Sequence, residues 1–192
     1  MLTLFFYLVI TILIVCEAYF IIKIIEYTYC VYIKYQIPLA TSTTRLRRAI
    51  IQEIKTNYKD AKTIVEIGSG FGGLSRLIAK NTNATVYSLE NMPFTIMLAK
   101  FFDAIFHSKN KTIWCDAYKY LAETDQRFDI AVAYMGPYEI QELAKYKNKI
   151  GILISMDFEL ENVQPIKVID VGHGHTTYNR KKYPHKVFIY KF

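Results

Sequence analysis

The sequence has few cysteines, and this shortage excludes two classes of small protein. Cys16, Cys30 and Cys115 are the three cysteines among 192 residues. They are odd in number, lie far apart and include no Cys-x-x-Cys or Cys/His pair with the spacing of metal ligands. This pattern argues against a disulfide-rich scaffold and against a zinc site, so no metal is expected.

Acidic residues are also in short supply relative to basic ones. There are 17 Asp and Glu against 24 Lys and Arg, which gives a formal net charge of +7. From Arg45 onward the chain holds 22 basic and 15 acidic residues, so the excess lies in this downstream part. Anionic lipid headgroups and nucleic acids are the acidic partners to consider. No RNA- or DNA-binding motif is present, so lipid is favoured and nucleic acid is not expected.

A long hydrophobic run opens the chain. Residues 2–22 read LTLFFYLVITILIVCEAYFII and carry one charge, at Glu17. About 20 apolar residues suffice for a helix to cross a bilayer. A cleavable signal peptide would need a basic region before the run and a small-x-small cleavage site, and the sequence has neither. We therefore predict one N-terminal transmembrane helix at 1–25, a juxtamembrane linker at 26–44 and a folded domain at 45–192.

Flanking charge predicts the orientation of this single-pass membrane protein. Basic residues follow the hydrophobic run and none precedes it; they are Lys23, Lys34, Arg45, Arg47 and Arg48. Because basic residues flanking a span favour the cytoplasmic side, the domain is expected there.

The remaining sequence alternates between strand-like and helix-like segments. The strands are expected at 63–67, 84–89, 111–115, 128–134, 150–156, 166–171 and 186–190. Helices are expected at 45–54, 74–80, 93–107 and 137–145. Such alternation predicts an α/β fold with a mostly parallel sheet and helices on both faces. No helix separates the last two strands, so they should form a hairpin with one antiparallel strand in the sheet.

A glycine-rich loop follows the first strand and opens a helix. It reads EIGSGFGG over 66–73. Gly68, Gly70 and Gly72, with Ser69 between the first two, permit a tight turn and let the backbone approach a nucleotide-like ligand. Gly68, Gly70 and Gly73 also fit the dinucleotide pattern G-x-G-x-x-G. The glycines alone therefore do not identify the cofactor.

Acidic residues at the strand ends favour S-adenosylmethionine (SAM). Glu66 precedes the first glycine by two positions, where a carboxylate would repel a pyrophosphate but suit an ammonium and a sulfonium group. Glu90 ends the second strand and could accept hydrogen bonds from both ribose hydroxyls, in SAM as in NAD. Asp116 and Ala117 follow the third strand. We expect Asp116 either beside the adenine amino group or as the cap of a short helix.

The order acidic-x-Gly-x-Gly-x-Gly resembles motif I of the class I SAM-dependent methyltransferases. The whole chain also resembles a small family of membrane-anchored protein-lysine methyltransferases, whose eukaryotic members modify the adenine nucleotide translocase and the c-subunit of ATP synthase. The similar features are the N-terminal apolar run, the segment 37–42, the loop at 66–70 and a chain end at the last strand, 187–190. Where that family usually has an acidic residue, this sequence has Phe71.

This resemblance implies several things about fold and site. The fold would be a Rossmann-like seven-stranded SAM-methyltransferase sheet with a terminal antiparallel hairpin. SAM would be the cofactor, Glu66 would lie near its methionine end, and the segment 38–42 would close over it.

The end of the fourth strand is where the methyl acceptor would arrive. This stretch, 134–137, reads YMGP and lacks the Asn/Asp-Pro-Pro-aromatic motif of amino-directed DNA methyltransferases. Tyr134 and Glu139 are candidate catalytic residues that could orient a lysine, although core packing and helix-start charge explain them equally well. The expected function is methylation of a lysine on a membrane-associated protein.

Two alternative functions remain open at this point. The acceptor could be a lipid or a quinone-type small molecule, since an anchor serves either kind of substrate. An NAD(P)-dependent oxidoreductase is the other alternative, because Tyr178 and Lys182 have the Tyr-x-x-x-Lys spacing of short-chain dehydrogenases. Pro184 makes a helix there improbable, so the two side chains should not share a face.

Overall fold

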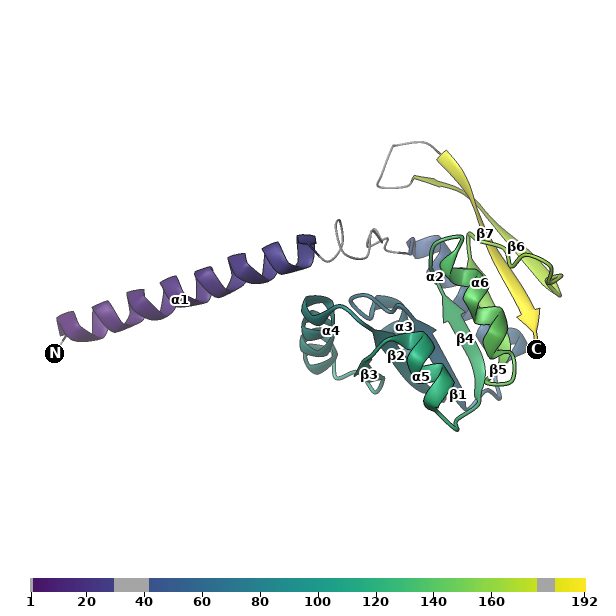
Figure 1. Ribbon diagram of the computed structural model, residues 1–192, viewed down its shortest axis with the longest axis horizontal. Helices are drawn as coiled ribbons and strands as arrows, with labels where there is room; N and C mark the ends of the chain where they lie inside the picture. The colour runs from purple at the N-terminus through teal and green to yellow at the C-terminus, as the bar shows by residue number, and fades with distance from the viewer. Residues whose placement is uncertain (1, 30–41, 176–181) are drawn as a thin grey trace.

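A seven-stranded sheet with the order β3-β2-β1-β4-β5-β7-β6 forms the centre of the computed structural model (Figure 1). The structure describes residues 2–29, 42–175 and 182–192. The strands are β1 (Thr63–Ile67), β2 (Thr85–Glu90), β3 (Lys111–Trp114), β4 (Phe128–Ala133), β5 (Ile150–Met156), β6 (Lys167–His175) and β7 (Lys182–Lys191). The helices are α1 (Leu2–Tyr29), α2 (Thr44–Asn57), α3 (Gly73–Asn81), α4 (Pro93–Ile105), α5 (Ala117–Glu123) and α6 (Glu139–Glu142), with a 3-10 helix, η2 (Leu143–Tyr146).

Strand direction confirms the predicted terminal hairpin. β1 to β5 pair in parallel, whereas β7 runs antiparallel to both β5 and β6. Because β7 is inserted between β5 and β6, its beginning lies beside the carboxyl end of β5. The carboxyl edge of the sheet therefore receives side chains from the ends of β1, β2, β4 and β5 and from the start of β7.

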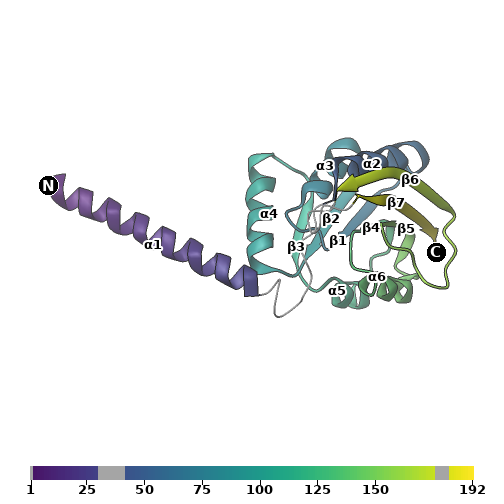
Figure 2. The ribbon, with the colours of Figure 1, turned by 90° about the horizontal axis from the view of Figure 1, so that it is seen from above.

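Two hydrophobic layers hold helices against the sheet (Figure 2). On one face α2 and α3 bury Leu46, Ile50 and Ile78 against alternate residues of the central strands. On the other face α5 and α6 bury Leu121 and Ile140. The alternation of side chains along each strand supplies both layers, which is what a parallel sheet covered on both faces requires.

The predicted elements agree with the structure except at several boundaries. β1 and β5 begin and end at the predicted residues, and α2 begins after Thr43, whose hydroxyl accepts a hydrogen bond from the Leu46 amide at 3.3 Å. The helix predicted at 137–145 is instead the short α6 followed by η2. The last two strands are longer than predicted, since each continues into polar residues where the hydrophobic pattern has ended.

The structure differs from the prediction in the N-terminal region. Residues 2–29 form the single helix α1, so helix continues into the predicted linker at 26–44, most of which lies outside the described residues. Among the residues that the structure describes, no helix is both long enough and apolar enough to cross a membrane. The transmembrane helix predicted at 1–25 therefore has no support in the structure.

Candidate active site

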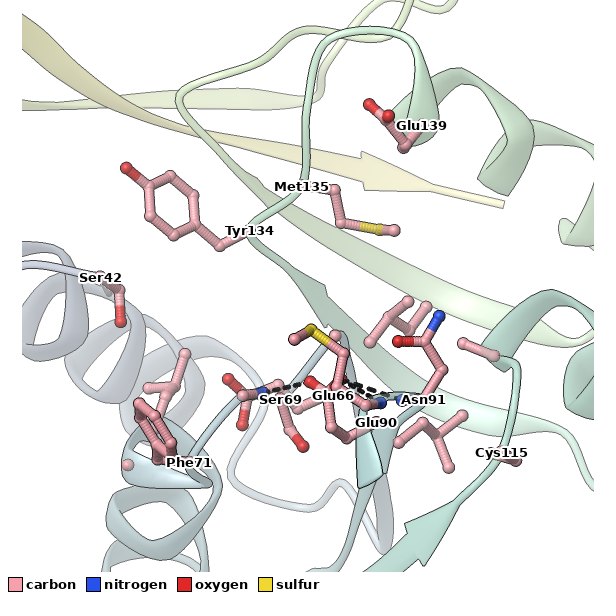
Figure 3. Close-up of a pocket in the computed structure, with 18 of the residues that line it drawn as sticks. Ser42, Glu66, Ser69, Phe71, Glu90, Asn91, Cys115, Tyr134, Met135 and Glu139 are labelled. Atoms are coloured by element: carbon pink, nitrogen blue, oxygen red, sulfur yellow. Dashed lines mark hydrogen bonds between the residues drawn. The ribbon is translucent and has the colours of Figure 1, made fainter. Parts of the chain in front are cut away.

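A cavity of about 350 Å³ opens at the carboxyl edge of the sheet (Figure 3). Nine of the ten predicted site residues line it: Glu66, Gly68, Ser69, Gly70, Glu90, Asp116, Ala117, Tyr134 and Glu139. The tenth, Gly72, does not line the cavity but precedes α3 as its N-cap. The structure thus brings residues from four strand ends to one place, as the strand order requires.

The glycine loop between β1 and α3 has the tight geometry that the sequence predicted. Gly68 and Gly70 have φ angles of 68° and 54°, a left-handed region that side chains with a Cβ rarely adopt. The Ser69 amide donates to the Leu89 carbonyl at 2.9 Å, which holds the loop against β2. The Ser69 hydroxyl is buried at the cavity and has no hydrogen-bond partner among the residues that the structure describes. It is available to a ligand.

Glu66 is a buried carboxylate with an altered pKa. Its side chain lies at the end of β1 and accepts a hydrogen bond from the Ser75 hydroxyl at the start of α3. Burial raises the pKa of Glu66 to about 7, against the opposing effects of Ser75 and of the nearby Arg47 guanidinium. A cationic ligand in the cavity would favour the ionised form, because an opposite charge offsets part of the desolvation cost.

Glu90 holds the loop as well as facing the cavity. One of its oxygens accepts from the Gly70 amide at 2.8 Å, and the other from the Asn91 and Met92 amides at 3.0 and 2.9 Å. Burial raises its pKa, and the three amide hydrogen bonds oppose that rise. A carboxylate offers about four acceptor sites, so roughly one remains for a ribose hydroxyl. Sequence reasoning predicted the ribose contact and missed the structural role.

Asp116 is the N-cap of α5. Its Oδ1 accepts from the Tyr118 and Lys119 amides at 2.9 and 3.1 Å, which confirms the capping alternative. Asp116 and Ala117 also line the cavity, so the predicted adenine contact stays a prediction. Met92 also lines the cavity. Trp114 is exposed and donates its indole N–H to the Asn91 carbonyl at 3.1 Å.

Tyr134 lies beside Asp157, which in turn contacts His185; the sequence analysis identified neither of these two titratable residues. Burial, followed by the nearby Asp157 carboxylate, raises the pKa of the Tyr134 phenol. Asp157 Oδ2 lies 2.8 Å from Nδ1 of His185. The buried Nε2 of that histidine has no hydrogen-bond partner within the described part of the chain. Asp157 has a φ of 64°, an unusual backbone conformation for a residue with a side chain. These residues come from β4, β5 and β7, so only the strand order brings them together.

Glu139 lies on the same side of the cavity as Tyr134 and Met135 (Figure 3). Its carboxylate occupies the space that a Cβ at position 136 would need, so Gly136 allows this placement. Its backbone carbonyl accepts a hydrogen bond from the Tyr118 hydroxyl at 2.7 Å. Glu139 therefore faces the cavity with a carboxylate, as predicted, and its role in catalysis stays a prediction.

Arg47 lines the cavity. The sequence analysis considered it only as one of the basic residues that predict the orientation of the chain in a membrane. It projects from α2, and its Nε donates to the Ser42 hydroxyl at 2.9 Å. Nη1 lies 3.0 Å from the position that a Cβ on Gly73 would occupy, so this glycine admits the guanidinium to the start of α3. Arg47 and Glu66 present opposite charges to one cavity. Such a pair is complementary to a ligand that carries both an ammonium and a carboxylate.

Sequence comparisons give no match: no protein-family model and no curated protein is similar to this chain. Solved structures are similar in fold. An RNA methyltransferase from Salinibacter ruber, in complex with S-adenosyl-L-homocysteine (SAH), has a TM-score of 0.61 and 16% identity, over 79% of this chain and 92% of that one. A precorrin-6y C5,15-methyltransferase from Geobacter metallireducens has a TM-score of 0.62 and 11% identity, over 81% and 92%.

A third similar structure is the magnesium protoporphyrin IX methyltransferase from Synechocystis with bound SAM. Its TM-score is 0.55 at 12% identity, over 76% of this chain and 77% of that one. The three proteins act on chemically different molecules, so the likeness carries no information about the acceptor. Together with the order of the strands and the antiparallel β7, it shows that this chain has the SAM-dependent methyltransferase fold.

Proposed function

We propose that the protein is a SAM-dependent methyltransferase that acts on a lysine of a membrane-associated protein. One observation carries the first half of this proposal. Within the SAM-methyltransferase fold, the glycine loop, Glu66 and Glu90 line a single cavity at the carboxyl edge of the sheet. A polyanionic cofactor would meet two buried carboxylates there, whereas the cationic SAM would meet favourable charges.

The charged residues of the cavity indicate where each part of SAM would bind. Glu66 would accept hydrogen bonds from the ammonium group, and Arg47 would donate to the carboxylate. The ribose would lie at Glu90, and the Ser69 hydroxyl would gain a partner. This arrangement directs the methyl group toward the side of the cavity formed by Tyr134 and Glu139.

The reaction itself needs positioning more than acid–base chemistry. The lone pair of a neutral lysine amine attacks the methyl carbon, the carbon–sulfur bond breaks, and the sulfonium becomes the neutral thioether of SAH. The amine must lose a proton to be nucleophilic, and the proton goes to solvent or to a nearby carboxylate. Tyr134 and Glu139 would hold the amine in line with the bond that breaks.

The NAD(P)-dependent oxidoreductase fits the structure less well. The NAD-binding doubly wound sheet has the order 3-2-1-4-5-6, whereas here the antiparallel β7 lies between β5 and β6. Of the two residues that suggested this alternative, Lys182 belongs to a strand and Tyr178 lies outside the described residues. Titration calorimetry with SAH and with NADH separates the two functions. We expect heat of binding with SAH; binding of NADH instead would overturn the proposal.

Attachment to a bilayer is proposed for α1. The large apolar side chains from Phe6 to Tyr29 are 36–66% exposed, and their transfer into lipid would be favourable by about 25 cal/mol per Å². A helix can attach to a bilayer without crossing it, so this proposal does not depend on the predicted transmembrane helix. The basic residues that follow α1 would be attracted to the anionic lipids of the cytoplasmic leaflet, which favours that side for the domain.

The acceptor is tested by following a radioactive methyl group. The purified protein is incubated with methyl-labelled SAM and membranes from its own source, and the products are separated into protein and lipid. We expect label in protein and, after acid hydrolysis, in methylated lysine. Label confined to the lipid extract would refute the lysine acceptor and favour the lipid or quinone alternative. The Gly70→Arg variant serves as the control that cannot bind cofactor.

A further inference from the structure

Helix α4 has an apolar outer face that the domain does not cover. Phe101 and Ile105 on the helix are 58% and 52% exposed, and Phe106 at its C-cap is 65% exposed. We call these three residues the α4 outer face. The opposite side of the same helix buries Thr95, Ile96 and Ala99. The helix is thus apolar on both sides, and only one side belongs to the protein core.

The aromatic part of this face is held in place by its neighbours. The rings of Phe102 and Phe106 stack with centroids 6.3 Å apart, and the Arg76 guanidinium lies 5.6 and 5.8 Å from them. Arg76 in turn pairs with Asp103 at 3.0 Å. A fixed apolar surface loses little conformational entropy on binding, so it is suited to docking.

The α4 outer face continues the contact that α4 makes with α1. The Tyr19 hydroxyl of α1 lies 3.9 Å from the Met97 sulfur. Met97, Phe101 and Ile105 follow at intervals of four residues, so they form one stripe along the helix. In both views α4 is the element of the domain on the side toward which α1 extends (Figures 1 and 2).

The surroundings of this face are positively charged. Lys100 on α4 and Lys109 in the segment after it are exposed, and the nearest carboxylate in this stretch, Asp103, is already paired with Arg76. Lys111 begins β3, and its ammonium lies 5.1 Å from the centre of the Tyr87 ring. An apolar patch with aromatic rings and lysines around it is complementary to the headgroup region of an anionic bilayer, where rings enter the acyl boundary and ammonium groups meet phosphate.

We propose that the α4 outer face docks on the anionic bilayer to which α1 attaches. This inference rests on the proposed membrane attachment and adds a second contact, which fixes the orientation of the domain. Met92 lines the cavity and directly precedes α4. Docking along α4 therefore holds the cavity within one helix length of the membrane surface, where a membrane-associated lysine can reach it.

Depth-dependent quenching in the full chain tests this docking. A nitrobenzoxadiazole fluorophore is attached at one position in each protein: at Ile105→Cys in a Cys16→Ser, Cys30→Ser background, or at the native Cys16 in a Cys30→Ser background. Cys115 can remain, because burial raises the pKa of its thiol to about 11 and the reactive thiolate is scarce at pH 7. The protein is reconstituted in vesicles of phosphatidylcholine and phosphatidylserine that contain doxyl-labelled lipid. Lys145→Cys in η2, directly after α6 and away from α4 in Figure 1, is the control position.

We expect doxyl lipid to quench the fluorophore at position 105 and at the native Cys16 of α1, but not at position 145. Changing Lys100 and Lys109 to Gln should lower quenching at position 105 by about threefold while leaving Cys16 quenched. Quenching at Cys16 with none at position 105 would overturn the docking of the α4 outer face and leave the attachment of α1 intact. Absence of quenching at both positions would overturn the attachment of α1 itself. A blue shift at position 105 without quenching would mean that protein, such as a second copy of the chain, covers the face, and would also overturn the docking.

Discussion

The two halves of the cavity are built in different ways. In the cofactor half, the loop after β1 and the end of β2 meet through backbone hydrogen bonds, three of them to Glu90 alone. In the acceptor half, Tyr134 lines the cavity after β4, and Asp157 after β5 and His185 in β7 lie behind it, outside the cavity lining; these three residues are linked through side chains. Backbone contacts specify a shape that many sequences can keep, whereas side-chain contacts change with each substitution.

We therefore expect the two halves of the cavity to have separate roles. The cofactor half should set the affinity for SAM and SAH, and the acceptor half should set turnover and the choice of acceptor. If the division holds, substitutions in one half leave the other property unchanged. The following predictions test this separation, beginning with the largest expected effect.

Substitution of Gly70 by Arg should abolish cofactor binding. The residue lines the cavity at a φ of 54°, so a long side chain would strain the loop and fill the ligand space. We expect the affinity for SAH, measured by titration calorimetry, to fall by more than about 100-fold. Gly172→Arg is the matched control: its φ is 80° and a Cβ there meets nothing within 4 Å. Equal loss in both variants would mean that backbone strain, not the cavity, explains the effect.

The difference between the two halves also explains how much of the site could be predicted from the sequence. Most of the cofactor half lies within one continuous stretch, 66–92, where the glycine spacing and the strand ends can be predicted from the order of residues. Gly73 lines the cavity and Gly72 is the N-cap of α3, because the geometry of the turn, and not the glycine spacing, decides which glycine faces the cavity. The strand alternation likewise predicted the sheet and its final hairpin.

The acceptor half could not be derived in this way. Asp157 and His185 are separated from Tyr134 by whole strands and helices, so a periodic pattern carries no sign of their proximity. Arg47 belongs to a helix before the sheet, and only packing brings it to Glu66. A polar residue directly after a strand, as Asp157 is, was the one available signal, and it becomes useful only once the strand order is known.

Removal of the Arg47 guanidinium should weaken the binding of the amino-acid part of the cofactor. In Arg47→Met we expect a loss of SAH affinity of about 10- to 100-fold, since a charge-assisted hydrogen bond contributes about 1.5–3 kcal/mol. Binding of methylthioadenosine, which lacks the ammonium and carboxylate, should change little. The exposed neighbour Arg48→Met is the control. An equal loss for both ligands would show that Arg47 supports the fold of the cavity and does not contact the carboxylate.

Glu66 predicts a pH dependence of binding in the cofactor half. Its pKa of about 7 means that the carboxylate gains its charge between pH 6 and 7.5, while the ammonium of SAH stays charged. The affinity for SAH should therefore rise roughly eightfold over this range. In Glu66→Gln the affinity should be low and independent of pH. A wild-type profile as flat as that of the variant would remove Glu66 from the ammonium site.

The same pKa affects the stability of the protein without ligand. Because the pKa in the folded state lies above the ordinary value of 4.5, protonated Glu66 favours the fold at low pH, and this contribution is lost as the pH rises through 7. Glu66→Gln should therefore raise the free energy of unfolding at pH 8, by up to about 3 kcal/mol, and change it little at pH 4.5. Urea unfolding at the two pH values measures the difference, and a variant that is no more stable at pH 8 would contradict the buried charge.

Loss of the Tyr134 hydroxyl should have the smallest effect, and only on turnover. Burial and Asp157 raise the pKa of this phenol, so it stays protonated at neutral pH and can orient the acceptor by hydrogen bonding but cannot act as a base. A neutral hydrogen bond contributes about 1 kcal/mol, so Tyr134→Phe should slow methyl transfer to membranes about fivefold. Affinity for SAH should remain within about twofold. Tyr138→Phe, at a tyrosine that is 85% exposed and outside the cavity lining, is the control. If Tyr134→Phe instead lowers SAH affinity as much as turnover, the two halves of the cavity are coupled, and the acceptor side helps to hold the cofactor.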